Sequence, residues 1–380
     1  MRFKDIVGQE SIKEVLRRGH ESGRVSHALL FTGESGRGGL ALALAYFQYL
    51  NCTNRQGGDS CGVCPSCRQA EALAHPDLHF VFPAPTTKES RSACDVALPA
   101  WREMVSSSGG YFSEQEWYAS VGMENKQGLI SKKEADEVIR KLSFKAFESE
   151  WKAVVMWLPE RMNDSSANCL LKILEEPWDK TLFLLVSEHP EKLLATILSR
   201  TQEVSVGRID REALAKAAVE RFGVAPADAA DAARVADGSM VTLKALFSAE
   251  AAEMRSENFS HFASLMRLAY GQKHMELMEW AEQMAKLGRE RQKHFLEYSL
   301  GMLRESYMLT AGLSPISYLW GEEAAFCTKF APFVNNSNIE LLIGAFERTL
   351  RDVMANGNAR IVFIHFALAA SKFFLNKPNK

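Results

Sequence analysis

A glycine-rich segment near the N-terminus has the order of strand, loop and helix that cradles phosphate groups. The apolar run 28–31 is expected to form a buried strand, and the alanine- and leucine-rich run 40–50 a helix. Gly33 and Gly38 stand at the two glycine positions of G-x-x-x-x-G-K-[ST], the pattern of a P-loop. The glycines of this loop are Gly33, Gly36, Gly38 and Gly39. The spacing therefore predicts the backbone shape of a phosphate-binding loop.

The same loop lacks the two side chains that carry out phosphate chemistry. Gly39 stands where the pattern requires a lysine, and Leu40 where it requires the hydroxyl that binds magnesium. A nucleotide hydrolase of this architecture also ends a neighbouring strand in acidic residues. Here that strand ends in Trp157 and Leu158, and the first nearby acid is Glu160. We therefore expect a degenerate loop without productive ATP binding, although its backbone amides could still contact a nucleotide weakly.

Four of the seven cysteines lie close together in the sequence, with the spacing C-x8-C-x2-C-x2-C. They are Cys52, Cys61, Cys64 and Cys67. Four thiolates at such spacing suit a closed tetrahedral zinc site, which leaves no open position for catalysis. The alternatives are unrelated free cysteines, or redox chemistry at Cys61-x-x-Cys64 that would leave the other two cysteines unexplained. We predict a structural zinc ion.

The elements that must position these groups alternate between strands and helices up to about residue 206. Expected strands cover 28–31, 79–82, 152–158, 181–186 and 202–206, and expected helices 11–21, 40–50, 131–142 and 163–174. Two of the helices begin with capping-box spacings, Ser11 with Glu14 and Ser131 with Glu134. This alternation predicts a parallel α/β sheet. His27, just before the first strand, is interpreted as structural, with a ligand role as the alternative.

Two later stretches and one insertion differ from this alternation. Residues 84–128 show no clean period and are expected to form an insertion, with one or two short helices at the edge of the domain. Residues 208–250 are alanine-rich and predict a small three-helix unit. Residues 251–380 carry long amphipathic stretches and predict a larger all-helical domain.

Composition sets outer limits on the class of protein. The chain has 380 residues, of which 47% are hydrophobic and 24% charged, values typical of a soluble globular protein with two or three domains. The net charge of −2 gives no overall basic excess for nucleic acid. We find no signal peptide and no apolar run long enough to span a membrane, and the clustered cysteines favour a reducing cytoplasm.

Several motifs, taken together and in order, carry a family resemblance. The chain resembles the delta prime subunits of the bacterial DNA polymerase III clamp loader, which belong to the AAA+ clade. The likeness is carried by the P-loop frame and the inserted four-cysteine module. It is also carried by Asp5-Ile-Val-Gly-Gln9, Val25-Ser-His-Ala28, Ala167-Asn-Cys-Leu-Leu-Lys-Ile-Leu-Glu-Glu-Pro177, Glu188-His-Pro-Glu-Lys-Leu-Leu193 and Ile197-Leu-Ser-Arg-Thr201. The family's Ser-Arg-Cys triplet is Ser199-Arg200-Thr201 in this chain.

The resemblance implies an architecture and a set of partners. The expected fold is an AAA+-type domain over 1–207, with the zinc module at 52–67, followed by a lid domain over 208–250 and a helical collar over 251–380 that mediates oligomerisation. The expected partners are gamma/tau-type and delta-type subunits in a hetero-pentameric ring that places a sliding clamp on primed DNA, with no membrane involved. The subunit would have no active site of its own, although it would belong to a DNA polymerase holoenzyme in the cytoplasm.

The resemblance also implies a role for Arg200. As a rigid stator, the subunit would supply this arginine in trans to the ATP of a neighbouring ATPase subunit, where it would stabilise charge on the γ-phosphoryl group. The alternative is an ordinary surface arginine. Two other functions remain open, namely an ATP-hydrolysing gamma-type subunit and a zinc-containing nucleic-acid-binding protein. The first would need Lys at 39 and Ser or Thr at 40, and the second more basic residues around the cysteines than Arg55 and Arg68.

Overall fold

The computed structural model describes residues 1–85, 92–123, 128–311, 321–336 and 338–374. The chain separates into two compact units. The first unit comprises Met1–Gly223 with Ala236–Lys244, and the second comprises Val224–Val235 with Ala245–Lys380. The first contains the sheet, and the elements described in the second are helices.

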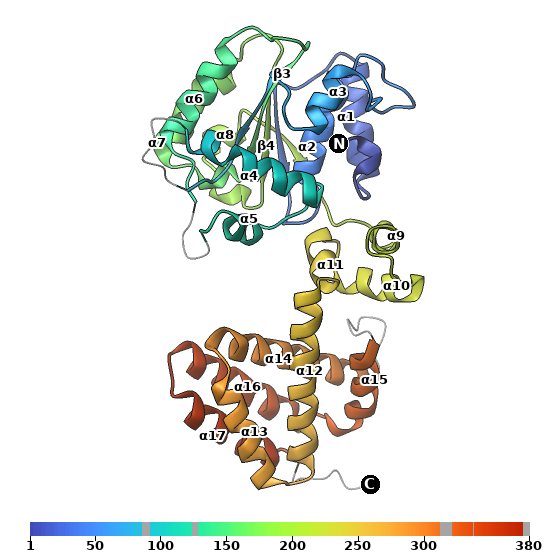
Figure 1. The fold of residues 1–380 in the computed structure, drawn as a ribbon, viewed down its shortest axis with the longest axis vertical. Coiled ribbons are helices and arrows are strands. Elements are labelled where there is room, and N and C mark those ends of the chain that lie inside the picture. Colours follow the sequence, from blue (N-terminus) through green and yellow to red (C-terminus); the bar gives the residue numbers. More distant parts are fainter. Residues whose placement is uncertain (86–91, 124–127, 312–320, 337, 375–380) are drawn as a thin grey trace. The chain divides into compact units, whose positions relative to one another are not determined.

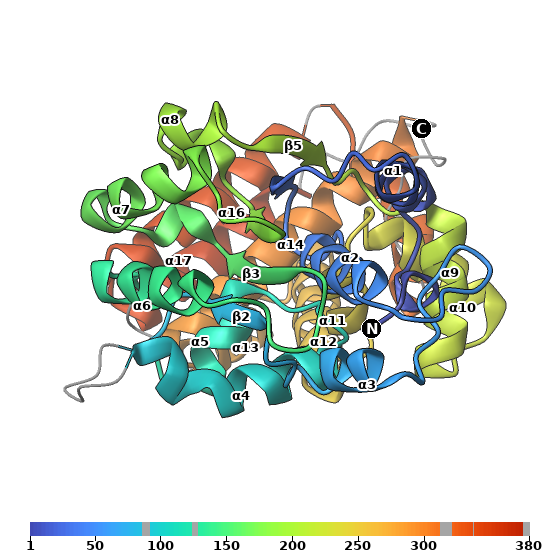
Figure 2. The same ribbon diagram turned by 90° about the horizontal axis from the view of Figure 1, so that it is seen from above.

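A single parallel sheet forms the centre of the first unit. Within the described residues its strands are β1 (Ala28–Thr32), β2 (Leu78–Val81), β3 (Lys152–Trp157), β4 (Thr181–Ser187) and β5 (Gln202–Ser205). Their order across the sheet is β2-β3-β4-β1-β5, and the neighbouring strands β3 and β4 are labelled in Figure 1. β5 therefore lies at the opposite side of the sheet from β2 (Figure 2). The predicted parallel α/β sheet is confirmed, with β2 beginning one residue earlier than expected.

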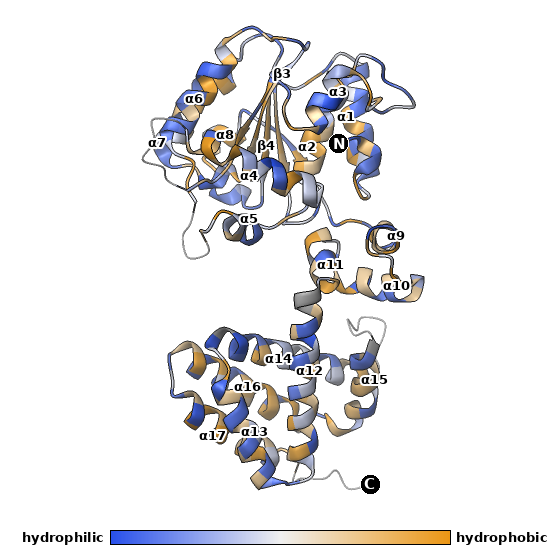
Figure 3. Ribbon diagram, in the orientation of Figure 1, coloured by the Kyte–Doolittle hydropathy of each residue, from blue (hydrophilic) through white to orange (hydrophobic). Residues whose placement is uncertain are grey.

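The central strands are apolar because both of their faces are covered. Every residue of β1, β3 and β4 is buried, and these strands are coloured as hydrophobic in Figure 3. Such continuous apolar runs are typical of parallel strands with helices on both sides. The edge strand β5 is largely exposed and carries Gln202 and Glu203.

Helices flank this sheet. Up to residue 246 the helical elements are η1 (Phe3–Asp5), α1 (Glu10–Glu21), α2 (Gly39–Leu50), α3 (Pro65–Glu71), α4 (Ala93–Ser108), α5 (Glu114–Ser120), α6 (Lys132–Ser143), η2 (Pro159–Arg161), α7 (Asp164–Glu175), η3 (Pro190–Lys192), α8 (Ala195–Leu198), α9 (Arg211–Phe222), α10 (Pro226–Val235) and α11 (Met240–Leu246). In α2, which packs on β1, β3 and β4, every residue from Leu40 to Leu50 is buried. A helix that is apolar all round belongs in a core.

The predicted capping box of the first helix is wrong. α1 begins at Glu10. Its N-cap is Gln9, which has a left-handed backbone (φ 62°) and lies two residues before Ser11, the expected cap. Ser11 therefore lies inside the first turn. The buried face also differs from the predicted one, because Val15 is 58% exposed while Lys13 is buried.

The second predicted capping box is also wrong, because Glu134 caps a different helix. Its carboxylate accepts hydrogen bonds from the Ser92 hydroxyl, from the Ala93 amide at 2.8 Å and from the Cys94 amide at 3.3 Å. These amides are free donors at the N-terminus of α4, where a carboxylate is also favoured by the helix dipole. Ser131 precedes α6 without a side-chain cap.

The 84–128 segment contains two described helices, and the first is longer than the short helices that were predicted. Its helix α4 has 16 residues and brings Trp101, which is fully buried, onto Phe82 with stacked rings 4.2 Å apart. Trp117 of α5 meets Trp101 edge-on, with ring centroids 5.3 Å apart. The segment thus contributes aromatic side chains to the core of the first unit. Residues 86–91 and 124–127 of the predicted insertion lie outside the described residues.

The second unit is helical, as predicted for the C-terminal part of the chain. After residue 248 its elements are α12 (Ala249–Tyr270), α13 (His274–Lys286), α14 (Arg289–Thr310), α15 (Gly321–Phe330), η5 (Ala331–Phe333), α16 (Ile339–Met354) and α17 (Ala359–Lys372). Their buried faces share one hydrophobic core that includes Phe295, Phe346 and Phe363. Across the described part of the chain, no helix combines the length and the apolar character needed to cross a membrane.

Candidate functional sites

The predicted P-loop has the expected backbone. The turn between β1 and α2 contains Gly36 at φ 82° and Gly38 at φ 99°, and Gly38 is the N-cap of α2. Positive φ values of this kind are readily available to glycine. A Cβ at Gly36 would lie 2.8 Å from the Val241 amide nitrogen, so the approach of α11 also requires glycine there. The turn between β1 and α2 thus depends on glycine at positions 36 and 38.

Aromatic side chains border the small cavity beside the loop. The cavity at the loop measures about 30 Å³ and is lined by Phe112 and Trp157 beside the loop glycines. A cavity of that size has room for a water molecule rather than a triphosphate. The Tyr111 ring lies 3.3 Å from the position of a Cβ on Gly38, and the Tyr111 hydroxyl accepts a hydrogen bond of 3.0 Å from the Val7 amide. We call Tyr111 and Phe112 the aromatic plug.

A second contact closes the loop from the side of α11. The Ser239 hydroxyl donates a hydrogen bond of 3.0 Å to the Ser35 carbonyl, and the Met240 amide donates one of 2.9 Å to the Gly36 carbonyl. Sequence reasoning missed both this contact and the aromatic plug. The only sequence signal was the Gly109-Gly110 pair before Tyr111, which marks a turn without indicating where it packs.

The acidic residues near the loop have structural partners. Glu160 accepts hydrogen bonds from the Ser187 hydroxyl at 2.8 Å, the Glu188 amide at 2.9 Å and the His189 amide at 3.0 Å. Burial, together with the nearby charges of Glu160 and Glu114, raises the pKa of Glu188 to about 7. Trp157 and Leu158 are buried at the end of β3, as expected for a core strand. Glu160 thus holds the end of β4 and the residues that follow it through three hydrogen bonds.

The four predicted cysteines come together. Cys52 follows α2, Cys61 and Cys64 lie on the next loop, and Cys67 lies in α3. Their sulfur atoms all lie within 4.8 Å of one another. A tetrahedral zinc ion with Zn–S bonds near 2.3 Å would separate its ligands by about 3.8 Å, so the donor set fits a closed zinc site.

Backbone amides surround the cysteine sulfurs. The Cys61 sulfur accepts from the Cys64 amide at 3.3 Å and from the Val63 amide at 3.5 Å, and these bonds lower the pKa of Cys61. Burial opposes ionisation of Cys64, yet hydrogen bonds from the Thr53 and Cys67 backbone lower its pKa to about 6. Thiolates are the form that binds metal, so the backbone favours ligation at Cys61 and Cys64, whereas burial raises the pKa of Cys52 and Cys67.

Arg200 lies at the edge of an open groove between α8 and β5. Its Nη2 atom is 3.2 Å from a Glu175 carboxylate oxygen, and its Nη1 atom donates to the Thr196 carbonyl at 3.0 Å. The side chain is 30% exposed. The groove has a volume of about 540 Å³ and is lined by Arg200, Glu175 and His27 among others. The guanidinium group is thus accessible from outside the first unit.

His27 has a structural partner. Its Nε2 atom lies 3.0 Å from the Leu174 carbonyl oxygen, which joins the start of β1 to the last turn of α7. This contact agrees with the structural interpretation of His27. It also anchors the turn that carries Glu175, a residue that sequence reasoning did not single out.

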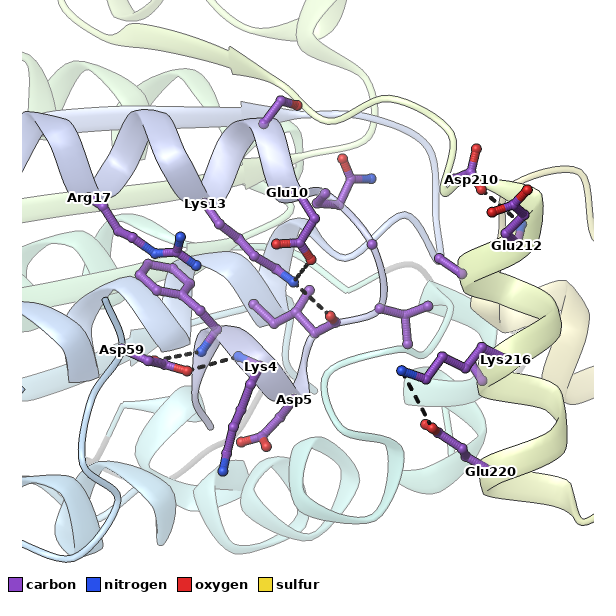
Figure 4. A pocket seen from close by; sticks show the side chains of 18 of the residues that line it. Lys4, Asp5, Glu10, Lys13, Arg17, Asp59, Asp210, Glu212, Lys216 and Glu220 are labelled. Carbon is purple, nitrogen blue, oxygen red and sulfur yellow. Dashed lines mark hydrogen bonds and ion pairs between the residues drawn. The ribbon is translucent and has the colours of Figure 1, made fainter. Parts of the chain in front are cut away.

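Another cavity of the first unit is a polar groove of about 960 Å³ between the N-terminal segment and α9 (Figure 4). Its charged groups largely pair with one another. Lys13 contacts Glu10 at 2.6 Å, and Lys216 contacts Glu220 at 3.8 Å (Figure 4). Asp59 accepts from the Lys4 amide at 2.9 Å. This balance of charge selects no particular ligand.

Comparisons with known proteins give one family and several relatives. Residues 8–210 match the family described as DNA polymerase III, delta subunit. The chain is 33% identical over 200 residues to DNA polymerase III subunit delta' of Yersinia pestis, covering 52% of this chain and 44% of the relative. It is 28% identical over 213 residues to DNA polymerase III subunit delta' of Bacillus subtilis, covering 56% and 52%.

A DNA polymerase III subunit with a different name is also similar to this chain. The chain is 30% identical over 210 residues to DNA polymerase III subunit tau of Escherichia coli, covering 55% of this chain and 26% of the relative. The matched segment therefore spans about half the length of the delta' relatives and about a quarter of the tau relative.

Proposed function

Because this chain belongs to the DNA polymerase III, delta subunit family, we propose that it is a non-hydrolysing, stator-like subunit of a clamp-loader complex. In this role it helps to place a sliding clamp on primed DNA. Its partners are gamma/tau-type ATPase subunits and a delta-type subunit in a hetero-pentameric ring. It belongs to a polymerase assembly and has no ATPase site of its own.

The observation that carries this proposal is the filled P-loop. The loop keeps its backbone shape, while Gly39 and Leu40 replace the lysine and the hydroxyl, and the remaining cavity is about 30 Å³. A triphosphate needs space, a lysine and a magnesium ligand at this point, and the loop offers none of the three. The preserved shape with lost chemistry supports a subunit that keeps the architecture of an ATPase and leaves hydrolysis to its neighbours.

Arg200 is the residue that we assign to the neighbour's ATP. Its guanidinium lies at the groove edge, and the ion pair to Glu175 and the carbonyl of Thr196 hold it close to the surface. The chain's own loop gives this arginine no phosphate to bind. A planar guanidinium can donate two hydrogen bonds to phosphate oxygens, and in trans it stabilises charge that develops during phosphoryl transfer.

Zinc on Cys52, Cys61, Cys64 and Cys67 completes the proposal. When bound, the ion would connect the end of α2, the following loop and α3 through its four cysteine ligands. Four sulfur ligands leave no position for a water or substrate, so we assign the ion a structural role.

A gamma-type ATPase is the second candidate, since the similarity to a tau subunit favours it. The small cavity at the P-loop, together with Gly39 and Leu40 in place of the lysine and the hydroxyl, argues against a gamma-type ATPase. A zinc-dependent nucleic-acid-binding role is less well supported, because only Arg55 and Arg68 lie near the cysteines in the sequence and the guanidinium of Arg55 already donates to the Tyr49 and Leu50 carbonyls at 2.8 and 2.6 Å.

The experiment that tests the proposal replaces Arg200 with alanine in a reconstituted complex. The complex should be built so that only the ATPase site expected to face Arg200 can hydrolyse ATP. Arg200→Ala should assemble normally and lower the turnover of that site by ~10³, the usual contribution of a finger in trans. Clamp loading should fall with it.

The matched control is Arg208→Ala, which removes another exposed arginine with an ion pair, at 2.9 Å to Asp237. We expect this variant to hydrolyse ATP like the unchanged complex. If Arg200→Ala assembles and the facing site keeps its rate, the assignment of Arg200 is wrong. If the isolated chain hydrolyses ATP above background, the non-hydrolysing role is wrong.

A further inference from the structure

An aromatic pocket in the second unit has no role in the proposed function. It lies where α12, α15 and η5 meet, and its volume is about 220 Å³. The lining residues are Met266, Arg267, Tyr270, Phe326, Lys329, Phe330 and Phe333. Small-molecule sites are usually larger, at ~300–1,000 Å³, so this pocket is sized for one bulky side chain.

The pocket exposes apolar surface that a folded chain would ordinarily bury. Tyr270 is 47% exposed and Phe333 is 41% exposed, and their ring centroids are 4.9 Å apart. Phe326 and Phe330 stack on each other with centroids 5.5 Å apart and form the opposite part of the lining. Contiguous exposed aromatic surface of this kind commonly marks an interaction site.

The charges at the rim indicate what would bind. Arg267 and Lys329 are both exposed, and the pocket lining contains no acidic residue. Among the described residues neither side chain has a hydrogen bond or an ion pair. Each lies near the C-terminal end of its helix, where the helix dipole favours a cation while the charged head stays in water.

We propose that this pocket binds an acidic peptide segment of a partner protein, which inserts one bulky apolar side chain. The inserted side chain would cover Tyr270 and Phe333, and flanking carboxylates would pair with Arg267 and Lys329. This mode combines a buried apolar anchor with charges at the rim, the usual division of roles in an interface.

Single-stranded nucleic acid is the competing occupant, because bases also stack on aromatic rings beside cations. The geometry favours the peptide. The pocket is concave and lined almost entirely by carbon, so an inserted base would lose hydrogen bonds at its polar edges. A leucine or phenylalanine side chain has no such bonds to lose.

The test uses the full chain and a labelled synthetic peptide with one central phenylalanine flanked by aspartates. Fluorescence anisotropy should show saturable binding that weakens as salt rises, because the rim charges are exposed. A peptide with lysines in place of the aspartates, and one with alanine in place of the phenylalanine, should each bind at least ~10-fold more weakly, a difference of about 1.4 kcal/mol.

Variants of the chain locate the binding. Arg267→Glu combined with Lys329→Glu should weaken binding of the acidic peptide by ~10-fold or more, whereas Arg348→Glu, which reverses an exposed charge on α16 outside the pocket, should not. All of these side chains are exposed, so each variant should remain folded, with a small loss of thermal stability for the two glutamates near helix C-termini. Phe333→Ala provides a second variant that removes part of the lining without changing charge, and it should also weaken binding.

Several outcomes would overturn the proposal. They are the absence of saturable binding, equal binding of the acidic and basic peptides, and equal binding by the unchanged chain and the Arg267→Glu, Lys329→Glu variant. Preferential binding of a thymidine oligonucleotide, abolished by the same two substitutions, would assign the pocket to nucleic acid instead. None of these measurements depends on ATP hydrolysis or on Arg200, so they succeed or fail independently of the proposed function.

Discussion

Arg200 is held by contacts that a phosphate group could replace. Its ion pair with Glu175 is partly exposed, with 60% of the glutamate side chain accessible. Exposed pairs of this kind contribute only ~0–1 kcal/mol, so the pair limits the rotamers of the guanidinium without fixing it strongly. The arginine is therefore pre-oriented at the groove edge and remains free to exchange its partner.

The cysteine cluster gives a prediction about metal content and stability. Cys64→Ser should lower zinc from one ion per chain to near none and cost more than ~2 kcal/mol in the free energy of unfolding, because a closed metal site contributes to folding. Metal analysis and thermal unfolding measure the two effects. Cys169→Ser, at a half-buried cysteine outside the cluster, serves as the control and should change neither. If the unchanged chain is prepared without chelator and metal analysis finds no zinc in it, the assignment of a zinc site is wrong.

Glu188 gives a prediction about pH. Its pKa is raised from 4.5 to about 7 by burial and by neighbouring carboxylates. The folded state therefore holds this proton more tightly than the unfolded state, and the associated stability is complete below about pH 4.5 and is lost as pH rises through 7. Glu188→Gln removes the titrating group. The change in the free energy of unfolding across this pH range should therefore shrink by on the order of 1–3 kcal/mol.

Thermal unfolding of the two forms between pH 4.5 and 8 measures this effect. Glu191→Gln is the control, since Glu191 lies on the surface nearby and its pKa is lowered instead. Parallel stability curves for Glu188→Gln and the unchanged chain across this range would show that Glu188 titrates normally.

At the scale of elements, the aromatic plug determines what the P-loop can do. Tyr111 and Phe112 reach the loop from the end of α4, and Ser239 reaches it from the start of α11. Restoring the lost chemistry with Gly39→Lys and Leu40→Thr should therefore leave nucleotide binding undetectable, because the cavity is still about 30 Å³. Adding Tyr111→Ala and Phe112→Ala should open space and permit binding.

A fluorescent ATP analogue with magnesium measures this series, and circular dichroism verifies the fold of each variant. Removing buried aromatics costs about 3–5 kcal/mol each, so a milder pair, Tyr111→Leu and Phe112→Leu, should also be measured. Nucleotide binding by the Gly39→Lys, Leu40→Thr variant alone would show that the plug does not control access.

At the scale of the whole molecule, the two compact units suggest separate tasks. The first carries the filled loop, the cysteine cluster and Arg200, and the second is a helical body with its own hydrophobic core. We expect the full chain to co-elute with gamma/tau-type and delta-type subunits in size-exclusion chromatography. Arg200→Ala should co-elute equally well, because its side chain is partly exposed and its partners, Glu175, Thr196 and Ser199, belong to the same unit. If the chain is mixed with both partners and still elutes separately from them, the proposed assembly is wrong.

The sequence alone was sufficient to predict features that depend on local spacing. The glycine pattern of the loop, the missing lysine at Gly39 and the four-cysteine spacing can be recognised without a structure, because turns and metal ligation demand particular residues at fixed separations. The continuous apolar runs also predicted β1, β3 and β4 as buried strands, since only parallel strands covered on both faces need them.

Only the tertiary structure decided the features that depend on distant partners. Glu134 has the spacing of a local cap, yet it binds the start of α4, some 40 residues earlier in the chain. Tyr111 and Ser239 close a loop that lies far from them in sequence. Each of these contacts depends on which surfaces meet when the core packs, and local propensity does not specify that choice. The sequence therefore showed that the lysine and the hydroxyl of the P-loop pattern are missing, and only the packing of the first unit revealed the aromatic residues beside the loop.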